Sequence, residues 1–170
     1  MFFEVGDGIL RVEGTTAAVE DGQPFAVRYA IEFDEPWRTR YAHVWGWSRS
    51  GPRSVTLEAD GQGRWLVDGR AAPHLEGCLD VDLESSALTN AFPVHRLGLA
   101  PGEAEDAPAA YVHALGLGVE RVDQRYVRLD SGTGNQRYDY TSPAHSFRCE
   151  LAYDAAGLVL EYPGIATRAA

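Results

Sequence analysis

The clearest structural signal in the chain is the stretch Val27-Arg28-Tyr29-Ala30-Ile31-Glu32-Phe33, in which large apolar side chains occupy every second position. Successive side chains of a β-strand point to opposite faces of its sheet, so this period of two predicts a strand with one buried face. Glu35-Pro36 then ends the strand, because proline has no N–H group to donate to a neighbouring strand.

Alternation of the same kind continues downstream and predicts that residues 38–47 form the next strand. One face of that strand carries Thr39, Tyr41, His43, Trp45 and Trp47. Further strands are predicted at 54–59, 64–67, 79–83, 93–99, 121–129, 135–140, 145–153 and 158–162. Residues 60–63, 130–134 and 154–157 are rich in Gly and Asp and are expected to form the turns between paired strands.

Only residues 84–92 have a helical pattern. Ser85 or Ser86 would cap this helix of about two turns, and Pro93 would end it. Many short strands at even spacing are typical of a sandwich, a barrel or a roll. Since no linker divides two cores, residues 1–170 are expected to form one domain.

The composition argues against several classes of partner. The formal charge is -10, from 25 acidic and 15 basic residues, and such a surface repels nucleic acid and anionic membranes. No stretch is apolar and long enough for stable membrane insertion, and the first residues do not resemble a secretory signal. The two cysteines, Cys78 and Cys149, lack the spacing of a zinc site, so a cytoplasmic location with reduced thiols is expected.

Asp80 and Asp82 form the strongest candidate for chemistry. At a spacing of two on a strand, both carboxylates leave the same face. Paired carboxylates can act as general acid and base or hold a divalent metal. Alternatively, they line a solvated outer face or pair with arginines, for which Arg96 and Arg40 are the candidates.

Aromatic and polar side chains share several predicted strand faces. Gln136, Tyr138 and Tyr140 share one face of their predicted strand. Gln124, Tyr126 and Arg128 share one face of the partner strand. An apolar core does not need such a polar-aromatic patch, whereas an amphiphile or sugar site does. For Trp45, Trp47 and Trp65, ordinary core packing is favoured. The chain contains no HExxH, GxSxG or GxGxxG pattern, so neither a cofactor nor a metal is expected.

Together, the order and spacing of these motifs resemble the bacterial family described as putative glycolipid-binding, formerly a domain of unknown function. The likeness extends from Phe25 to Ile165. The motifs that carry it are Trp37-Arg38-Thr39-Arg40, Gly63-Arg64-Trp65, Asp68-Gly69, 77–83, Thr89-Asn90, Arg96-Leu97, Gln124 with Tyr126, Tyr138 with Tyr140, Gly157-Leu158-Val159 and Tyr162-Pro163-Gly164.

The resemblance implies an antiparallel spiral β-roll wrapped around one short helix, with members that can dimerise. The shape is similar to that of the carriers that move lipoproteins to the outer membrane, and glycolipid binding is inferred for the family from that shape. Because this chain shows no signal peptide, an intracellular lipid or glycolipid is the expected ligand. We expect the ligand-binding residues to be Arg40, Trp65, Asp80, Asp82, Asn90, Arg96, Gln124, Tyr126, Tyr138 and Tyr140.

Three hypotheses about function follow. The first is non-catalytic binding of a glycolipid or similar amphiphile inside the roll. The second is a carbohydrate-active enzyme with Asp80 and Asp82 as acid and base and Arg96 as anion ligand, which requires both carboxylates in one concave pocket. The third is a homodimeric interaction module, since an open roll has free strand edges and surface aromatics.

Overall fold

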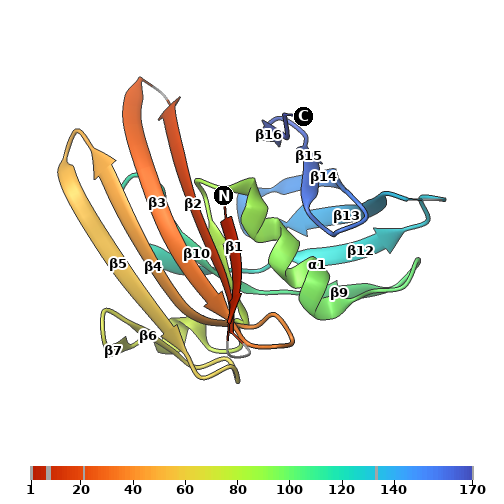
Figure 1. The fold of residues 1–170 in the computed structure, drawn as a ribbon, viewed down its shortest axis with the longest axis horizontal. Helices are drawn as coiled ribbons and strands as arrows, with labels where there is room; N and C mark the ends of the chain where they lie inside the picture. The colour runs from red at the N-terminus through yellow and green to blue at the C-terminus, as the bar shows by residue number, and fades with distance from the viewer. Residues whose placement is uncertain (1, 7–8, 21, 133, 170) are drawn as a thin grey trace.

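The computed structural model describes residues 2–6, 9–20, 22–132 and 134–169. The strands in these ranges form three sheets, and α1 (Ala91–Leu97) is the one α-helix they contain. Figure 1 shows α1 in the middle of the molecule, between the large N-terminal sheet and the C-terminal sheet. The expected fold class, mainly antiparallel β with a single short helix, is confirmed.

The N-terminal sheet is a meander whose strands follow chain order. Its members are β1 (Phe2–Gly6), β2 (Ile9–Glu20), β3 (Gln23–Phe33), β4 (Thr39–Ser48), β5 (Gly51–Ala59), β6 (Trp65–Val67) and β7 (Arg70–Ala71). The alternating residues of β3 from Val27 to Phe33 are buried, as predicted. In β4 the buried face carries the small residues Ala42, Val44 and Gly46, so the aromatic row from Tyr41 to Trp47 lies on the outer face.

A small sheet links the two larger ones. It has the order β11 (Val119–Val122), β10 (Ala109–Val112), β8 (Asp80–Leu83), and β8 pairs with β10 in parallel. Parallel strands are usually covered on both faces, and all four residues of β8 are buried. A solvated outer face for Asp80 and Asp82 is therefore wrong.

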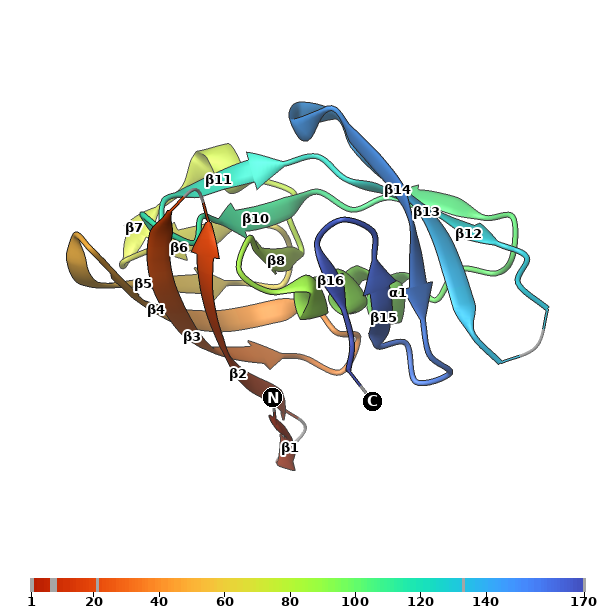
Figure 2. The same cartoon turned by 90° about the horizontal axis from the view of Figure 1, so that it is seen from above.

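The C-terminal sheet contains the two predicted hairpins. Its order is β16 (Ala166–Thr167), β15 (Val159–Tyr162), β14 (Phe147–Tyr153), β13 (Gln136–Ser142), β12 (Arg125–Leu129) and β9 (Ala104–Asp106). β12 pairs with β13 so that Tyr126 is opposite Tyr140, while Thr133 of their connector lies outside the described residues. The predicted strand 121–129 is interrupted at Asp123-Gln124, where the chain passes from one sheet to the other (Figure 2).

The helix begins and ends later than expected. Residues 87–90 form the 3-10 turn η2 (Ala87–Asn90), and α1 then includes Pro93, so the predicted helix at 84–92 is displaced and the strand predicted at 93–99 is wrong. Pro93 is the third residue of α1, where its missing N–H has no partner inside the helix. Gly98, with φ +54°, ends the helix in the left-handed conformation.

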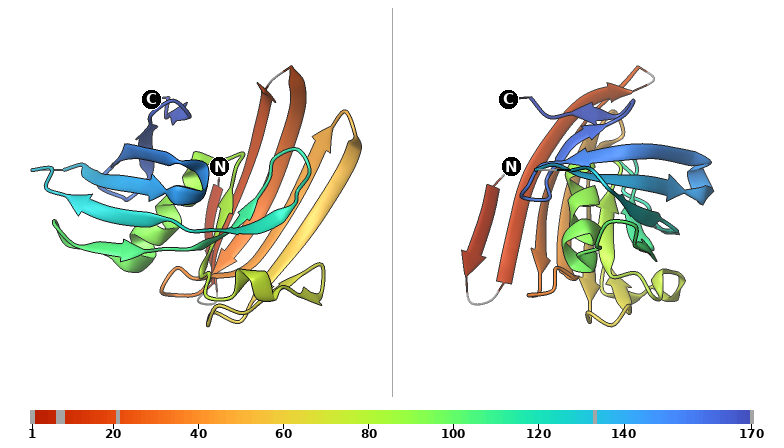
Figure 3. Two further views of the ribbon diagram at one scale, coloured as in Figure 1. Left: turned by 180° about the vertical axis from the view of Figure 1, so that it is seen from behind. Right: turned by 90° about the vertical axis from the view of Figure 1, so that its right-hand side faces the viewer.

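Two hydrophobic clusters fill the space around α1. One lies against the N-terminal sheet and includes Phe33, Leu57 and Phe92 of the helix. The other lies against the C-terminal sheet and combines Ala91 and Val94 with five tyrosines, namely Tyr126, Tyr138, Tyr140, Tyr153 and Tyr162. The views from behind and from the side show the helix between the same two layers (Figure 3). The rolled interior is thus filled by side chains along most of its length.

Candidate functional site

A pocket of about 180 Å³ opens where β8, η2 and the C-terminal strands meet. It is lined by aromatic rings and by polar groups together. The aromatic residues are Tyr111, Tyr140, Phe147 and Tyr162, and the polar ones are Asp82, Glu84, Ser86, Asn90, Ser142 and His145. Leu83, Ala87 and Ile165 complete the lining. Such convergence of polar groups in a concave aromatic site is typical of small-ligand binding.

The carboxylate of Asp82 is fixed in the pocket wall by two donors. The hydroxyl of Thr89 donates to its Oδ1 at 2.6 Å, and the Nε2 of Gln124 donates to its Oδ2 at 2.6 Å. Burial raises the pKa of Asp82, while both hydrogen bonds act in the opposite direction because they stabilise the ionised form. Short bonds from neutral donors thus hold Asp82 in one orientation.

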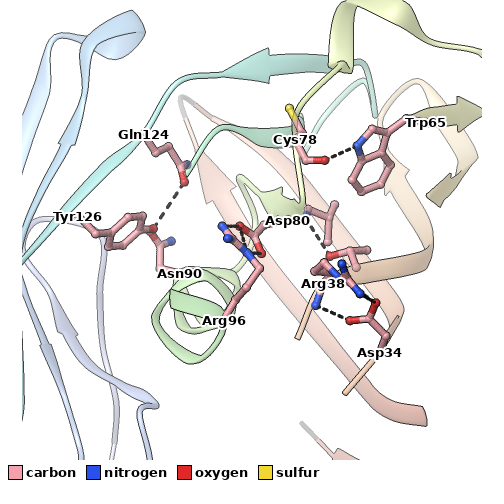
Figure 4. Close-up of polar contacts among 11 residues, drawn as sticks. Asp34, Arg38, Trp65, Cys78, Asp80, Asn90, Arg96, Gln124 and Tyr126 are labelled. Atoms are coloured by element: carbon pink, nitrogen blue, oxygen red, sulfur yellow. Dashed lines mark hydrogen bonds and ion pairs between the residues drawn. The ribbon is translucent and has the colours of Figure 1, made fainter. Parts of the chain in front are cut away.

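Asn90, at the end of η2, accepts hydrogen bonds from two tyrosines of the C-terminal sheet. The hydroxyl of Tyr126 donates to Asn90 Oδ1 at 3.1 Å, and the hydroxyl of Tyr153 donates to its backbone carbonyl at 3.1 Å. Figure 4 shows Gln124, Tyr126 and Asn90 side by side. Gln124 and Tyr126 thereby position the groups that line the pocket, although they are outside its lining.

The aromatic side of the pocket is a cluster of three steeply inclined rings. Tyr140 and Tyr162 have centroids 5.9 Å apart at 76°, Phe147 and Tyr162 5.8 Å at 57°, and Tyr140 and Phe147 6.3 Å at 59°. Tyr111 approaches from β10, with its ring 5.3 Å from that of His145. Ring surface therefore contributes to the pocket from four strands, namely β10, β13, β14 and β15.

The tyrosine hydroxyls of the pocket remain protonated. Burial raises the pKa of Tyr140 and of Tyr162, and the nearby carboxylate of Asp82 raises both further. Burial likewise raises the pKa of Tyr111, with an added effect of Glu84. These hydroxyls are hydrogen-bond donors at any physiological pH.

Asp80 lies on the same strand but is not part of the pocket lining. Its carboxylate is 2% exposed and accepts hydrogen bonds from Nε of Arg96 at 3.0 Å and from Nη2 at 2.6 Å (Figure 4). Burial raises the pKa of Asp80, and the guanidinium of Arg96 counteracts that effect. The pair joins β8 to α1. Asp80 and Asp82 thus do not face one pocket, and the geometry does not support them as a catalytic pair.

Three other expected site residues lie elsewhere. The Nε of Arg40 donates to the carbonyl of Ala59, and the indole of Trp65 donates to the carbonyl of Cys78 at 2.8 Å. Tyr138 is buried and donates to Gln136 at 3.3 Å. The pocket lining therefore includes Asp82, Asn90 and Tyr140 of the predicted set, Gln124 and Tyr126 support it, and the other five do not reach it.

Sequence reasoning missed Tyr111, Ser142, His145, Phe147 and Tyr162 as pocket residues. Tyr162 belongs to the motif Tyr162-Pro163-Gly164, which was a usable signal. Tyr111 had none, because its strand β10 lies in a segment for which the sequence predicts no element.

In the described ranges, no group of three or more His, Cys, Asp and Glu side chains is arranged to hold a metal ion. None of the helices described there is long and apolar enough to cross a bilayer.

The chain is similar to known proteins along nearly its whole length. The family model described as "Putative glycolipid-binding" matches residues 1–168. The crystal structure of a DUF1089 family protein from Pseudomonas aeruginosa superposes with a TM-score of 0.84 at 34% identity, covering 99% of this chain and 90% of that one. No curated protein sequence matches. The match over residues 1–168 shows that this chain belongs to the putative glycolipid-binding family.

Proposed function

We propose that the pocket binds the head group of a glycolipid or similar amphiphile without converting it chemically. The observation that carries this proposal is the convergence of inclined aromatic rings with the fixed polar groups Asp82 and Asn90 in one pocket. Aromatic faces pack against the C–H surface of a sugar ring, and fixed polar groups bind its hydroxyls. The family description supports the same class of ligand.

The size of the pocket limits what it holds. At about 180 Å³ it lies below the range of roughly 300–1,000 Å³ that is usual for drug-sized ligands, so it accommodates a head group and not an acyl chain. Ile165 lines the pocket and is 57% exposed, so an acyl chain would leave the pocket over this side chain. The expected apolar cavity inside the roll is replaced by the packed clusters around α1.

The test is to fill the pocket. In the Ala87→Trp variant an indole ring enters the lining, so binding of octyl glucoside, measured by calorimetry, should weaken at least about tenfold, or about 1.4 kcal/mol. The control is Ala100→Trp, which places the same ring in the exposed loop after α1, outside the pocket lining. Unchanged binding in Ala87→Trp, or no amphiphile bound to the purified protein by native mass spectrometry, would contradict the proposal.

We also place the protein in the cytoplasm. Cys78 is buried and Cys149 half-buried, and both are free thiols, which supports a reducing compartment.

A second candidate function, a homodimeric module, is favoured by the outer face of the N-terminal sheet. Val19 is 68% and Trp47 48% exposed there, and the strand register places Ala17, Ala26 and Trp47 side by side. Such a face suits a self-complementary interface. Light scattering should then show a dimer that dissociates in Trp47→Ser. A monomer at all concentrations would exclude this candidate.

A further inference from the structure

The pocket combines negative charge with aromatic surface. Asp82 and Glu84 both line it, and no arginine occurs among its described lining residues. His145 is the one basic side chain of the lining, and its Nδ1 lies 3.3 Å from the hydroxyl of Ser142. The pocket therefore presents acceptors and ring faces to whatever enters it.

Asp80 and Asp82 differ in how their charge is compensated. Both are buried on β8, two positions apart. Asp80 is paired with the guanidinium of Arg96, whereas the hydrogen bonds of Asp82 come from the neutral side chains of Thr89 and Gln124. His145 also lines the pocket and favours the ionised form of Asp82, although no ion pair joins the two among the described residues. Neutral donors replace only part of the hydration of a buried carboxylate, so a cation in the pocket would compensate the charge of Asp82 more fully.

The rings of the pocket suit the same kind of group. Tyr140, Phe147 and Tyr162 are inclined to one another by 57–76° instead of being stacked flat. Aromatic side chains in the lining of a pocket can bind ammonium groups through cation–π attraction. The tyrosine hydroxyls carry no charge of their own: burial raises the pKa of Tyr140 and of Tyr162, and the carboxylate of Asp82 adds to that effect.

We propose that the head group accepted by the pocket carries a positively charged nitrogen, as an amino sugar or a quaternary ammonium group does. Asp82 and Glu84 attract the charge, and the aromatic side chains of the same lining offer it cation–π contacts. This inference rests on the proposed function, since it names the chemical class of the ligand at the same site.

The experiment compares amphiphiles with one octyl chain and different head groups, each below its micelle concentration. The probes are octyl glucoside, its 2-amino-2-deoxy analogue, octyl glucuronide and octyltrimethylammonium, titrated by calorimetry at pH 7. At least one cationic probe should bind about tenfold tighter than octyl glucoside, and the glucuronide should bind most weakly. The relative affinity of the amino sugar and the ammonium probe distinguishes the two sources of the charge.

Variants separate a specific site from general attraction to an acidic protein. Asp82→Asn should bring the ratio of the affinity for the cationic probe to the affinity for octyl glucoside close to one, while octyl glucoside still binds. Glu84→Gln should lower the same ratio in part. Asp139→Asn removes a carboxylate that pairs with Arg148 outside the pocket, so it should leave the preference unchanged. Ala87→Trp should abolish binding of the cationic probe. If Asp82→Asn does not fold, the inference is tested by the head-group series on the unaltered protein and by the affinity ratio in Glu84→Gln.

The outcomes distinguish the two proposals. If octyl glucoside binds as tightly as both cationic probes, the inference of a cationic head group is overturned while head-group binding stands. If Asp82→Asn and Asp139→Asn weaken the cationic probe equally, the attraction is general and the inference is also overturned. If no probe binds, head-group binding itself is wrong.

Discussion

At the residue scale, the paired acids of β8 show how one short motif acquires two roles. The sequence motif correctly marked Asp80 and Asp82 as unusual, and the alternative of an arginine partner is confirmed for Asp80 and Arg96. The sequence did not reveal that β8 is buried on both faces, because that follows from its parallel pairing with β10. Alternation alone suggests an exposed face whenever polar residues recur every second position.

The ion pair of Asp80 and Arg96 should be important for stability. Arg96→Met leaves Asp80 buried without its cation, so the free energy of unfolding in urea should fall by about 3–5 kcal/mol. Arg96→Lys keeps the charge but not the two-pronged geometry, so its loss should be smaller. The double variant Asp80→Asn/Arg96→Met should recover part of the stability. Equal losses in the double variant and in Arg96→Met would contradict a pair interaction.

Asp82 should make stability depend on pH. Its folded-state pKa lies above the unfolded value because burial disfavours the charge, so the native state binds the proton more tightly. The cost of the buried charge is therefore absent below the unfolded pKa and grows as pH rises toward the folded pKa. Asp82→Asn cannot ionise, so its stability relative to the unaltered protein should rise as the pH is raised from about 4, the unfolded value, toward neutrality. Urea unfolding across that range checks this, and a constant difference would contradict it.

At the scale of elements, the strands were easier to predict than the helix. Clean alternation located β3 and β4, and Gly–Asp turns located the C-terminal hairpins. The sequence predicts the helix too early in the chain, because a proline usually ends a helix, whereas Pro93 lies in the first turn of α1, where proline is tolerated. The predicted strand 121–129 divides between two sheets at Gln124, and no local pattern distinguishes a strand that changes sheets from a continuous one.

The end of α1 depends on Gly98. Its φ is +54°, and a Cβ at this position would meet nothing within 4 Å, so a substitution tests backbone conformation alone. Gly98→Ala should lower the free energy of unfolding by about 1 kcal/mol. Gly116→Ala is the matched control, because Gly116 also has open space and is not among the residues of positive φ. Equal effects of the two substitutions would exclude this role for the left-handed residue.

At the scale of the whole molecule, the candidate site is the part least visible in the sequence. The pocket lining comes from β8, η2, β10, β13, β14, β15 and the 3-10 turn η3 (Pro143–His145), which are brought together by the passage of the chain between sheets. Asp82, Asn90 and Tyr140 were predicted because they stand in motifs. Tyr111 and Phe147 were not, since their position depends on tertiary packing. In β4 the large aromatic side chains were expected to pack in the core, but they lie on the outer face and the small residues lie on the buried face.

We propose that the chain unfolds as one domain, since α1 contributes Phe92 to one core cluster and Val94 to the other. Trp45, Trp47 and Trp65 lie on the N-terminal sheet and Trp37 in the loop between two of its strands, whereas five of the eight tyrosines belong to the core cluster of the C-terminal sheet. Tryptophan fluorescence and tyrosine near-ultraviolet dichroism therefore report on different halves. Their urea transitions should coincide in midpoint and slope. Separate transitions would indicate two domains.

The order of the lining residues along the chain also sets when the pocket can form during synthesis. Asp82 is translated well before Tyr162 and Ile165. A nascent chain on the ribosome can form the N-terminal meander early, but the pocket lacks one wall until Tyr162 and Ile165 have emerged as well. A nascent chain that has not yet reached Tyr162 therefore exposes the acid of β8 without the full set of rings beside it.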